Sequence, residues 1–232
     1  MDMIRISNGI YDWQGFHLAM DFAAAENSIT AILGPSGAGK STLLNIIAGF
    51  EHLTSGSIAL QGADHTATAP AARPVSFVFQ DNNTFAHMSA RDNVALGVSP
   101  SLKLNTSQWT SVDEALAKVG ISHLATRKPG EMSGGERQRI ALARVLVRQR
   151  PILLLDEAFA ALGPSLRIEM LELVKTLQSE QQLTVLMVTH QPEDAKAIAD
   201  SIMFVSDGVV QPPMPVQRFF KSVDAAIQNY LL

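Results

Sequence analysis

Five short segments of this chain are almost continuously apolar, which is typical of strands buried on both faces. They are residues 28–33, 74–79, 151–156, 183–189 and 201–207. Helical periodicity fills several of the gaps, as in residues 166–181, which place a leucine or methionine on one face every three or four positions. Apolar strands that alternate with amphipathic helices predict an α/β fold with a largely parallel sheet covered on both faces.

One stretch, from about residue 81 to residue 130, has helical segments and turn signals but no strong strand pattern. We therefore expect a mostly helical insertion here, between the core segments 1–80 and 131–232. A proline-rich connector at residues 211–215 precedes a last amphipathic stretch at residues 216–232.

Composition narrows the classes of function. The 232 residues, 47% of them hydrophobic, suffice for one α/β domain with a buried core. The absence of cysteine excludes disulfides and Cys-ligated zinc, and it suits a reducing compartment. A net charge of −4 and a pI near 5.8 give no excess of basic residues, which disfavours a nucleic-acid-binding function. Because no segment reaches the roughly 18 apolar residues of a membrane-spanning helix, we expect any membrane role to depend on a partner.

A glycine-rich loop, GPSGAGKS at residues 34–41, follows one apolar segment and precedes a helical one. Its glycines let backbone N–H groups point at a phosphate, and the helix N-terminus adds partial positive charge. We expect Lys40 to reach the β- and γ-phosphates and the Ser41 hydroxyl to bind Mg²⁺. An ordinary glycine turn is the alternative, which this context disfavours.

Two carboxylates end the apolar run ILLLDE at residues 152–157. Asp156 is expected to hold Mg²⁺, and Glu157 to orient or deprotonate the attacking water, because phosphoryl transfer to water needs a positioned nucleophile. Alone, such a pair is often a plain strand end, but the phosphate loop favours the catalytic interpretation.

Gln80 and His190 each follow an apolar segment, at the edge of a parallel sheet where ligands bind. The Gln80 amide could touch both Mg²⁺ and the water, and the His190 imidazole could bond the γ-phosphate. A solvated glutamine and a structural histidine are the plainer alternatives.

A second glycine-to-helix junction, MSGGERQR at residues 132–139, follows more than 90 residues later. It offers a serine hydroxyl and free N–H groups, which makes a second anion site. Since one chain already has a phosphate loop, this junction is either idle or faces the nucleotide of another molecule.

Together these motifs resemble the ATP-binding subunit of ABC transporters over nearly the whole chain. The resemblance implies a P-loop NTPase with a RecA-like core, an N-terminal antiparallel β part and the helical insertion, in one domain spanning residues 1–232. It also implies that two copies pack head to tail, so that each ATP lies between the phosphate loop of one chain and the signature of the other.

The resemblance assigns roles to residues at matching positions. The catalytic residues are Glu157, His190, Gln80 and Lys40. The phosphate-loop residues that bind ATP are Gly34, Pro35, Ser36, Gly37, Ala38, Gly39, Lys40, Ser41 and Thr42. The signature residues that contact the ATP of the partner are Ser133, Gly134, Gly135 and Glu136, and the Mg²⁺ ligands are Ser41, Gln80 and Asp156.

An aromatic residue that stacks on adenine is also implied, because Tyr11 stands 29 positions before Lys40, where the family places it. Trp13 is the nearby alternative, and a plain core or surface aromatic is another.

Three positions depart from the family pattern. Gly163 stands where an Asp usually helps to join the two sites of the dimer, Ala158 replaces a common Pro, and Glu136 replaces the frequent signature Gln. We expect Gly163 to weaken the cooperativity of the two sites without abolishing hydrolysis.

The segment at residues 62–105 resembles the ATPases of bacterial thiamine importers. This implies permease subunits that dock near Gln80 and the helical insertion, on residues 81–89, with a periplasmic binding protein beyond them. It also places the chain at the cytoplasmic face of the inner membrane. Importers of iron, polyamine or sulfate are the alternative, ahead of a soluble ABC ATPase without a transport role and of a P-loop kinase.

Overall fold

A computed structural model describes residues 2–80 and 84–231. All five predicted apolar segments form strands, which confirms the α/β prediction. They are β3 (Ile29–Leu33), β6 (Val75–Val78), β7 (Ile152–Asp156), β8 (Thr184–Val188) and β9 (Ser201–Ser206). Their order in the sheet is β9-β3-β8-β7-β6, and each neighbouring pair is parallel.

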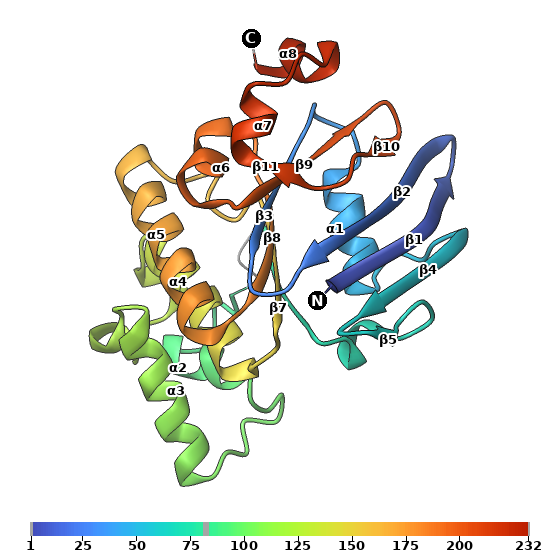
Figure 1. Ribbon diagram of the computed structural model, residues 1–232. Helices are drawn as coiled ribbons and strands as arrows, with labels where there is room; N and C mark the ends of the chain where they lie inside the picture. The colour runs from blue at the N-terminus through green and yellow to red at the C-terminus, as the bar shows by residue number, and fades with distance from the viewer. Residues whose placement is uncertain (1, 81–83, 232) are drawn as a thin grey trace.

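An antiparallel group of strands extends the sheet from the N-terminal part of the chain (Figure 1). It contains β1 (Asp2–Trp13), β2 (Phe16–Ala25), β4 (Ser55–Leu60) and β5 (Ala63–Asp64). The short strand β10 (Val209–Val210) connects the two parts, because it pairs in parallel with β2 and antiparallel with β9. The two-residue strand β11 (Met214–Pro215) also pairs with β9, within the proline-rich segment that we predicted to be a connector.

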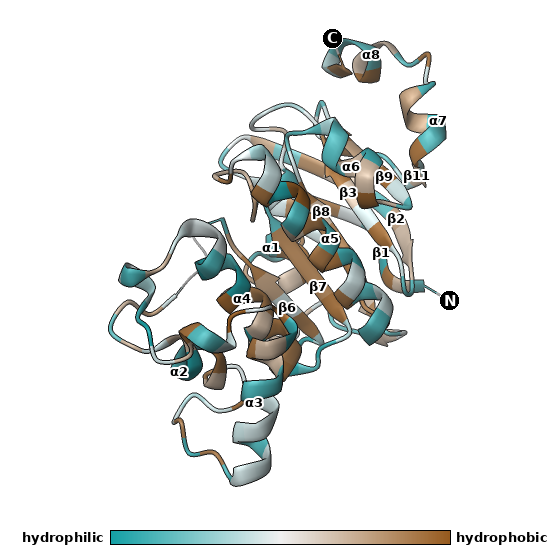
Figure 2. Cartoon of the chain, turned by 90° about the vertical axis from the view of Figure 1, so that its left-hand side faces the viewer, coloured by the Kyte–Doolittle hydropathy of each residue, from teal (hydrophilic) through white to brown (hydrophobic). Residues whose placement is uncertain are grey.

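The parallel strands separate two hydrophobic cores (Figure 2). Leu153 and Leu155 of β7 face one core, and Ile152 and Leu154 face the other. The helix α1 (Lys40–Ala48) contributes to the core shared with β1, β2 and β4. The opposite core contains residues of α4 (Gly134–Arg148), α5 (Pro164–Gln181) and α6 (Pro192–Ile198). Burial on both faces explains why these strands are continuously apolar.

The helices α2 (Ala90–Ala95) and α3 (Thr106–Lys118) pack against α4 on the side of the molecule away from the antiparallel strands. Arg91 joins them, because its guanidinium bonds both oxygens of Asp113, at 2.6 and 2.7 Å, and lies 4.2 Å from the ring centre of Trp109. Short 3₁₀ turns at Pro70–Ala72, Ser122–Leu124 and Pro129–Glu131 complete the connections. The predicted start of the insertion, at residues 81–83, lies outside the described residues.

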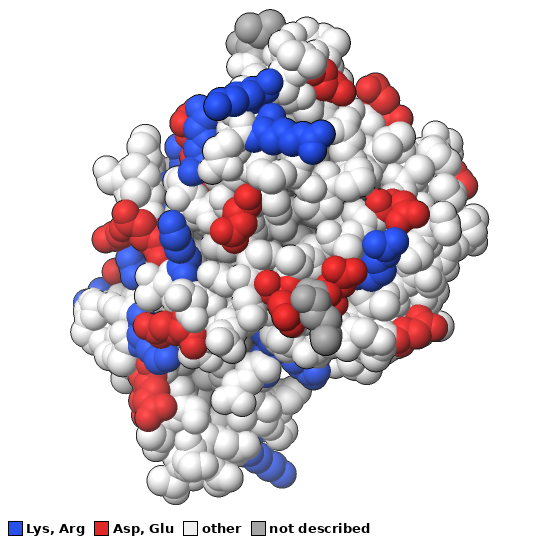
Figure 3. Space-filling view, viewed as in Figure 1, with Lys and Arg blue, Asp and Glu red and all other residues white. Residues whose placement is uncertain are grey.

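The final amphipathic stretch folds into two helices. They are α7 (Val216–Phe220) and α8 (Ala225–Leu231). Asp224 interrupts the stretch because its carboxylate accepts a bond from the N–H of Ala226 at 2.9 Å, which caps α8. No helix within residues 2–80 and 84–231 is both long and apolar enough to cross a membrane. Basic and acidic side chains are both spread over the face shown in Figure 3.

Candidate nucleotide-binding and hydrolysis site

Four strand ends bring the predicted site residues to one edge of the sheet. The phosphate loop follows β3, and its neighbour β8 leads to His190, two residues beyond the strand. Next to β8 lies β7, which ends at Asp156 with Glu157 directly after it, and then β6, two residues before Gln80. This is the edge at which open α/β sheets bind ligands.

The phosphate loop has a backbone that only glycine suits at its start. Gly34 has φ of 152°, and a Cβ there would overlap the carbonyl oxygen of Val205 in β9. Lys40 is the first residue of α1, and its Nζ donates to the carbonyl oxygens of Gly34 and Pro35, both at 2.8 Å. Burial lowers the pKa of Lys40, while the nearby carboxylates of Glu157 and Asp156 oppose that shift. The Lys40 ammonium is thus hydrogen-bonded to the backbone of its own loop.

Ser41 and Asp156 are in direct contact. The Ser41 hydroxyl donates to the Asp156 carboxylate at 2.9 Å. Burial raises the pKa of Asp156, and the bond from Ser41 opposes the rise. The two residues therefore place a hydroxyl and a carboxylate oxygen side by side, which are ligand types that Mg²⁺ prefers.

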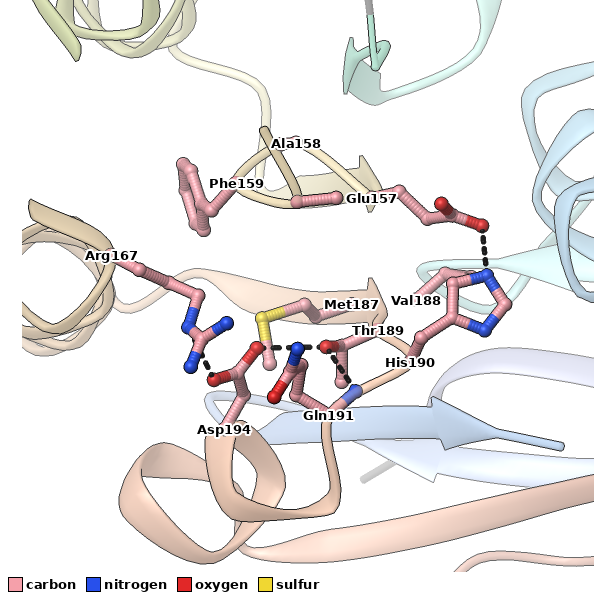
Figure 4. A pocket seen from close by; sticks show the side chains of 11 residues that line it. Glu157, Ala158, Phe159, Arg167, Met187, Val188, Thr189, His190, Gln191 and Asp194 are labelled. Atoms are coloured by element: carbon pink, nitrogen blue, oxygen red, sulfur yellow. Dashed lines mark hydrogen bonds and ion pairs between the residues drawn. The ribbon is translucent and has the colours of Figure 1, made fainter. Parts of the chain in front are cut away.

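Glu157 and His190 form a second contact, drawn in Figure 4. Glu157 Oε1 lies 2.6 Å from His190 Nε2. The backbone of Glu157 has φ of 47°, a left-handed conformation that is uncommon outside glycine. Its N–H donates to the carbonyl of Val188 at 3.2 Å, which fixes the end of β7 to the end of β8. Gln80 is exposed, and within the described residues it has no hydrogen bond to this pair.

The signature stretch begins α4. Ser133 is the N-cap residue, and it forms a capping box with Glu136. The Glu136 carboxylate accepts bonds from the N–H and the hydroxyl of Ser133, at 2.6 and 2.8 Å. A Cβ on Gly135 would overlap the side chain of Leu166 of α5, so α4 and α5 approach each other closely at this position. Further along α4, Gln138 donates to the carbonyl of Ala158 at 2.5 Å, which ties the signature helix to the segment after Glu157.

Tyr11 lies in an unexpected environment for a residue that stacks on adenine. Its side chain is buried, and its hydroxyl donates to Glu51 at 3.1 Å. Trp13, by contrast, is 62% exposed. The role of Tyr11 stays a prediction, and stacking on its ring would require the surrounding side chains to move.

Phe16 is an aromatic residue that the sequence reasoning missed. It contacts the phosphate loop, since a Cβ on Gly39 would lie 2.8 Å from the Phe16 ring. With Pro35–Ala38, and with Tyr230 of α8, it lines a cavity of about 760 Å³. The available signal was its place across the β1–β2 hairpin from Trp13, on the strand face that also carries Tyr11.

A phosphate loop after a parallel strand, with a serine–carboxylate pair and a glutamate–histidine pair beside it, defines the class of P-loop nucleotide hydrolases. The family model described as ABC transporter matches residues 18–160. The chain therefore belongs to the ABC transporter family, as an ATP-binding protein that hydrolyses ATP.

Relatives named thiamine import ATP-binding protein ThiQ match most of the chain. The protein of Mesorhizobium japonicum is 52% identical over 94% of this chain and 86% of its own length. The protein of Brucella suis is 48% identical over 98% and 95%. The protein of Salmonella choleraesuis is 54% identical over 84% of each chain.

Solved structures of ATP-binding cassettes share the fold. The ADP conformation of a cassette from an ABC transporter aligns with a TM-score of 0.90 at 22% identity, and it covers 100% of this chain and 98% of its own. A dimeric cassette in a post-hydrolysis state, bound to ADP and Pi, aligns with a TM-score of 0.78 at 27% identity over 92% and 99%. These likenesses agree with the predicted P-loop fold.

Proposed function

We propose that this chain is the energy-coupling ATPase of a bacterial thiamine importer. The observation that carries the proposal is that relatives named for thiamine import are 48 to 54% identical over most of the chain. The edge of the sheet supplies the hydrolytic residues, and the division into a core (1–80 and 131–232) and a helical insertion (81–130) supplies a surface for partners. Thiamine itself would be bound by the importer's other subunits.

Hydrolysis would begin with an exchange of bonds at the phosphate loop. The Lys40 ammonium, now bonded to Gly34 and Pro35, would turn to the β- and γ-phosphates. The backbone N–H groups of the loop and the N-terminus of α1 would hold the same charges. Phosphate binding would also favour the charged lysine, whose pKa burial alone lowers.

Glu157 would then orient and deprotonate the attacking water, while His190 bonds the γ-phosphate. The present bond of 2.6 Å between them keeps both side chains at the ends of adjacent strands. Positioning and charge stabilisation are the main sources of catalysis in this chemistry. Removal of the Glu157 carboxylate should therefore affect turnover much more than ATP binding.

The residues at the Ser41–Asp156 contact fit Mg²⁺, and Gln80 would supply a third oxygen ligand. Among residues 2–80 and 84–231, no three His, Cys, Asp or Glu side chains gather into a metal site. Mg²⁺ characteristically binds through one or two carboxylates and the substrate's phosphates, which matches this sparse set. When bound, the ion would neutralise charge on the β- and γ-phosphates.

A second copy of the chain would complete each site through Ser133, Gly134, Gly135 and Glu136. Support comes from the likeness to a dimeric cassette and from the exposure of Ser133 at the N-terminus of α4. ATP would thus hold two chains together, and hydrolysis would release them.

Permease subunits would dock beside Gln80, at the cytoplasmic face of the inner membrane. Aromatic rings gather here: Phe77 and Phe79 stack at 4.1 Å, and Phe50, which is 52% exposed, lies 5.8 Å from Phe79. Phe77 and Phe79 are half-buried, and aromatic residues are enriched at protein interfaces. Of the predicted docking residues 81–89, the first three lie outside the described residues.

Glu157→Gln tests the hydrolytic assignment. We expect binding of a fluorescent ATP analogue within twofold of the parent and a kcat at least about 100-fold lower, as for loss of a general base. Glu180→Gln, an exposed change on α5, is the matched control and should retain the parental kcat. Parental turnover of Glu157→Gln would remove Glu157 from its role.

Uptake of labelled thiamine at nanomolar concentration tests the substrate. Cells that lack this gene and any second thiamine transporter should lose uptake. The intact chain should restore it, and Lys40→Ala should not. Unchanged uptake in the deletion strain would reject thiamine and favour another small-molecule importer.

A further inference from the structure

A small cavity of about 60 Å³ separates the Glu157–His190 contact from a buried ion pair (Figure 4). In that pair, Arg167 Nε of α5 lies 3.2 Å from Asp194 Oδ1 of α6. The two side chains are only 18% and 8% exposed. Burying two charges costs free energy, and removal of one partner leaves the other uncompensated. Because the Arg167–Asp194 pair carries this cost beside the reaction site, we looked for a function that it could serve.

The second oxygen of Asp194 reaches the segment that carries His190. The Thr189 hydroxyl donates to Asp194 Oδ2 at 2.8 Å, and it accepts a bond from the N–H of Gln191 at 3.1 Å. Thr189 and Gln191 are the residues on either side of His190. A single carboxylate thus fixes the backbone on both sides of the histidine, through the Thr189 hydroxyl.

The arginine connects the same carboxylate to the segment that follows Glu157. Arg167 lies at the start of α5, and its backbone N–H donates to the carbonyl of Gly163 at 3.0 Å, as in the regular helix pattern. Residues 158–163 lead directly from Glu157 to this helix. The two catalytic side chains are therefore joined twice, once directly and once through Arg167 and Asp194.

We propose that Asp194 is a positioning residue that holds His190 against the γ-phosphate, and that Arg167 links its position to the segment at residues 158–163. This rests on the proposed function of His190. In the proposed head-to-tail dimer, Gly163 of this segment stands at the position that helps to join the two sites in the family, so the ion pair would transmit the presence of the partner to the histidine. Neither residue touches the substrate.

A double-mutant cycle with His190 tests the proposal in the full-length dimer with its permease. Asp194→Asn keeps the shape of the side chain and removes its charge. We expect it to lower kcat about tenfold or more with KM for ATP within twofold, and Asp194→Glu to recover part of the loss. In a His190→Ala background, Asp194→Asn should change kcat by less than twofold, because there is no histidine left to position.

The alternative outcomes are distinct. An equal loss in both backgrounds, or no loss in the parent, would overturn the positioning role. A parental rate for His190→Ala alone would instead reject the proposed function of His190, and the present inference with it. Lys118→Met, which removes the exposed pair with Glu180, is the matched control and should leave kcat unchanged.

NMR spectroscopy of the folded protein complements the kcat measurements. The ¹⁵N resonances of the His190 ring report its tautomer and mobility. Asp194→Asn and Arg167→Met should both shift or broaden them in the nucleotide-bound chain, whereas Lys118→Met should not. If Asp194→Asn does not fold, Arg167→Met takes its place in the same cycle; ring resonances left unchanged by Arg167→Met would overturn the link to residues 158–163.

Discussion

The Glu136 carboxylate accepts hydrogen bonds from both the backbone N–H and the hydroxyl of Ser133. These are the groups that the proposed dimer offers to the ATP of the partner. The backbone bond from Ser133 lowers the pKa of Glu136, so the carboxylate is ionised at neutral pH. The signature serine is thus bonded to a negatively charged side chain of its own chain.

Glu136→Gln should therefore strengthen the ATP-dependent dimer. Glutamine preserves the capping box, so α4 should remain stable. We expect the dimer Kd in a Glu157→Gln background to fall by up to about fivefold, because exposed charge interactions amount to about 0.2–1 kcal/mol. Analytical ultracentrifugation at low and high salt measures it, with Glu131→Gln as the control. A weaker dimer would contradict the repulsion.

Gly163→Asp should stabilise the chain and restore coupling between sites. Gly163 is the N-cap of α5 without a side-chain bond, and a Cβ there would meet nothing within 4 Å. An aspartate can cap the helix and favour its dipole, a gain of about 0.3–1 kcal/mol. Thermal unfolding measures the gain, and ATP titration of hydrolysis measures the coupling. A Hill coefficient equal to that of the parent would contradict the coupling hypothesis.

Asp156→Asn should make the nucleotide-free chain more stable but inactive. Because burial raises the pKa of Asp156, its favourable contribution to folding is present when it is protonated and is lost as the pH rises through that pKa. Asparagine can still accept the bond from Ser41. We expect a free energy of unfolding higher by up to about 1 kcal/mol at pH 7, with the difference vanishing below about pH 4. Denaturant titrations at both pH values check this; a less stable variant at pH 7 would argue against it.

Asp113→Asn should destabilise the α2–α3 contact in a pH-dependent manner. Arg91 lowers the pKa of Asp113, so the contribution of this pair is present above the unfolded pKa and is lost as the pH falls through the depressed folded value. Because the pair is largely exposed, we expect a cost of about 0.5–1 kcal/mol at pH 7 and a smaller cost at about pH 3. Equal costs at both pH values would show that lost packing dominates.

The parallel strands and the phosphate chemistry could be predicted because each leaves a local signature. A strand buried on both faces is continuously apolar, as β7 is, and a phosphate loop needs glycines at fixed spacing. The antiparallel strands have a weaker sequence pattern. The register shift between Ile6 and Gly9 breaks the alternation of β1, and no periodicity in the sequence reveals it.

Contacts between distant elements could not be predicted. Tyr11 matches the family spacing, yet only packing decides that it is buried against Glu51 while Phe16 reaches the phosphate loop. Likewise, Arg167 and Asp194 read as ordinary helix-surface charges in the sequence. Their burial depends on how α5 packs against α6, and this packing cannot be inferred from the sequence pattern.

The hydrogen bonds within the phosphate loop also bear on which anions it would bind most readily. Lys40 is held by two carbonyl oxygens of its own loop, and Ser41 is held by Asp156. A ligand that replaces both sets of bonds must reach the lysine and the serine at once. Inorganic phosphate, which is abundant in cytoplasm, offers a single group, whereas a triphosphate spans the lysine and the serine at once. By reach alone, these bonds therefore favour a triphosphate over inorganic phosphate, because only the longer anion can replace both sets of bonds.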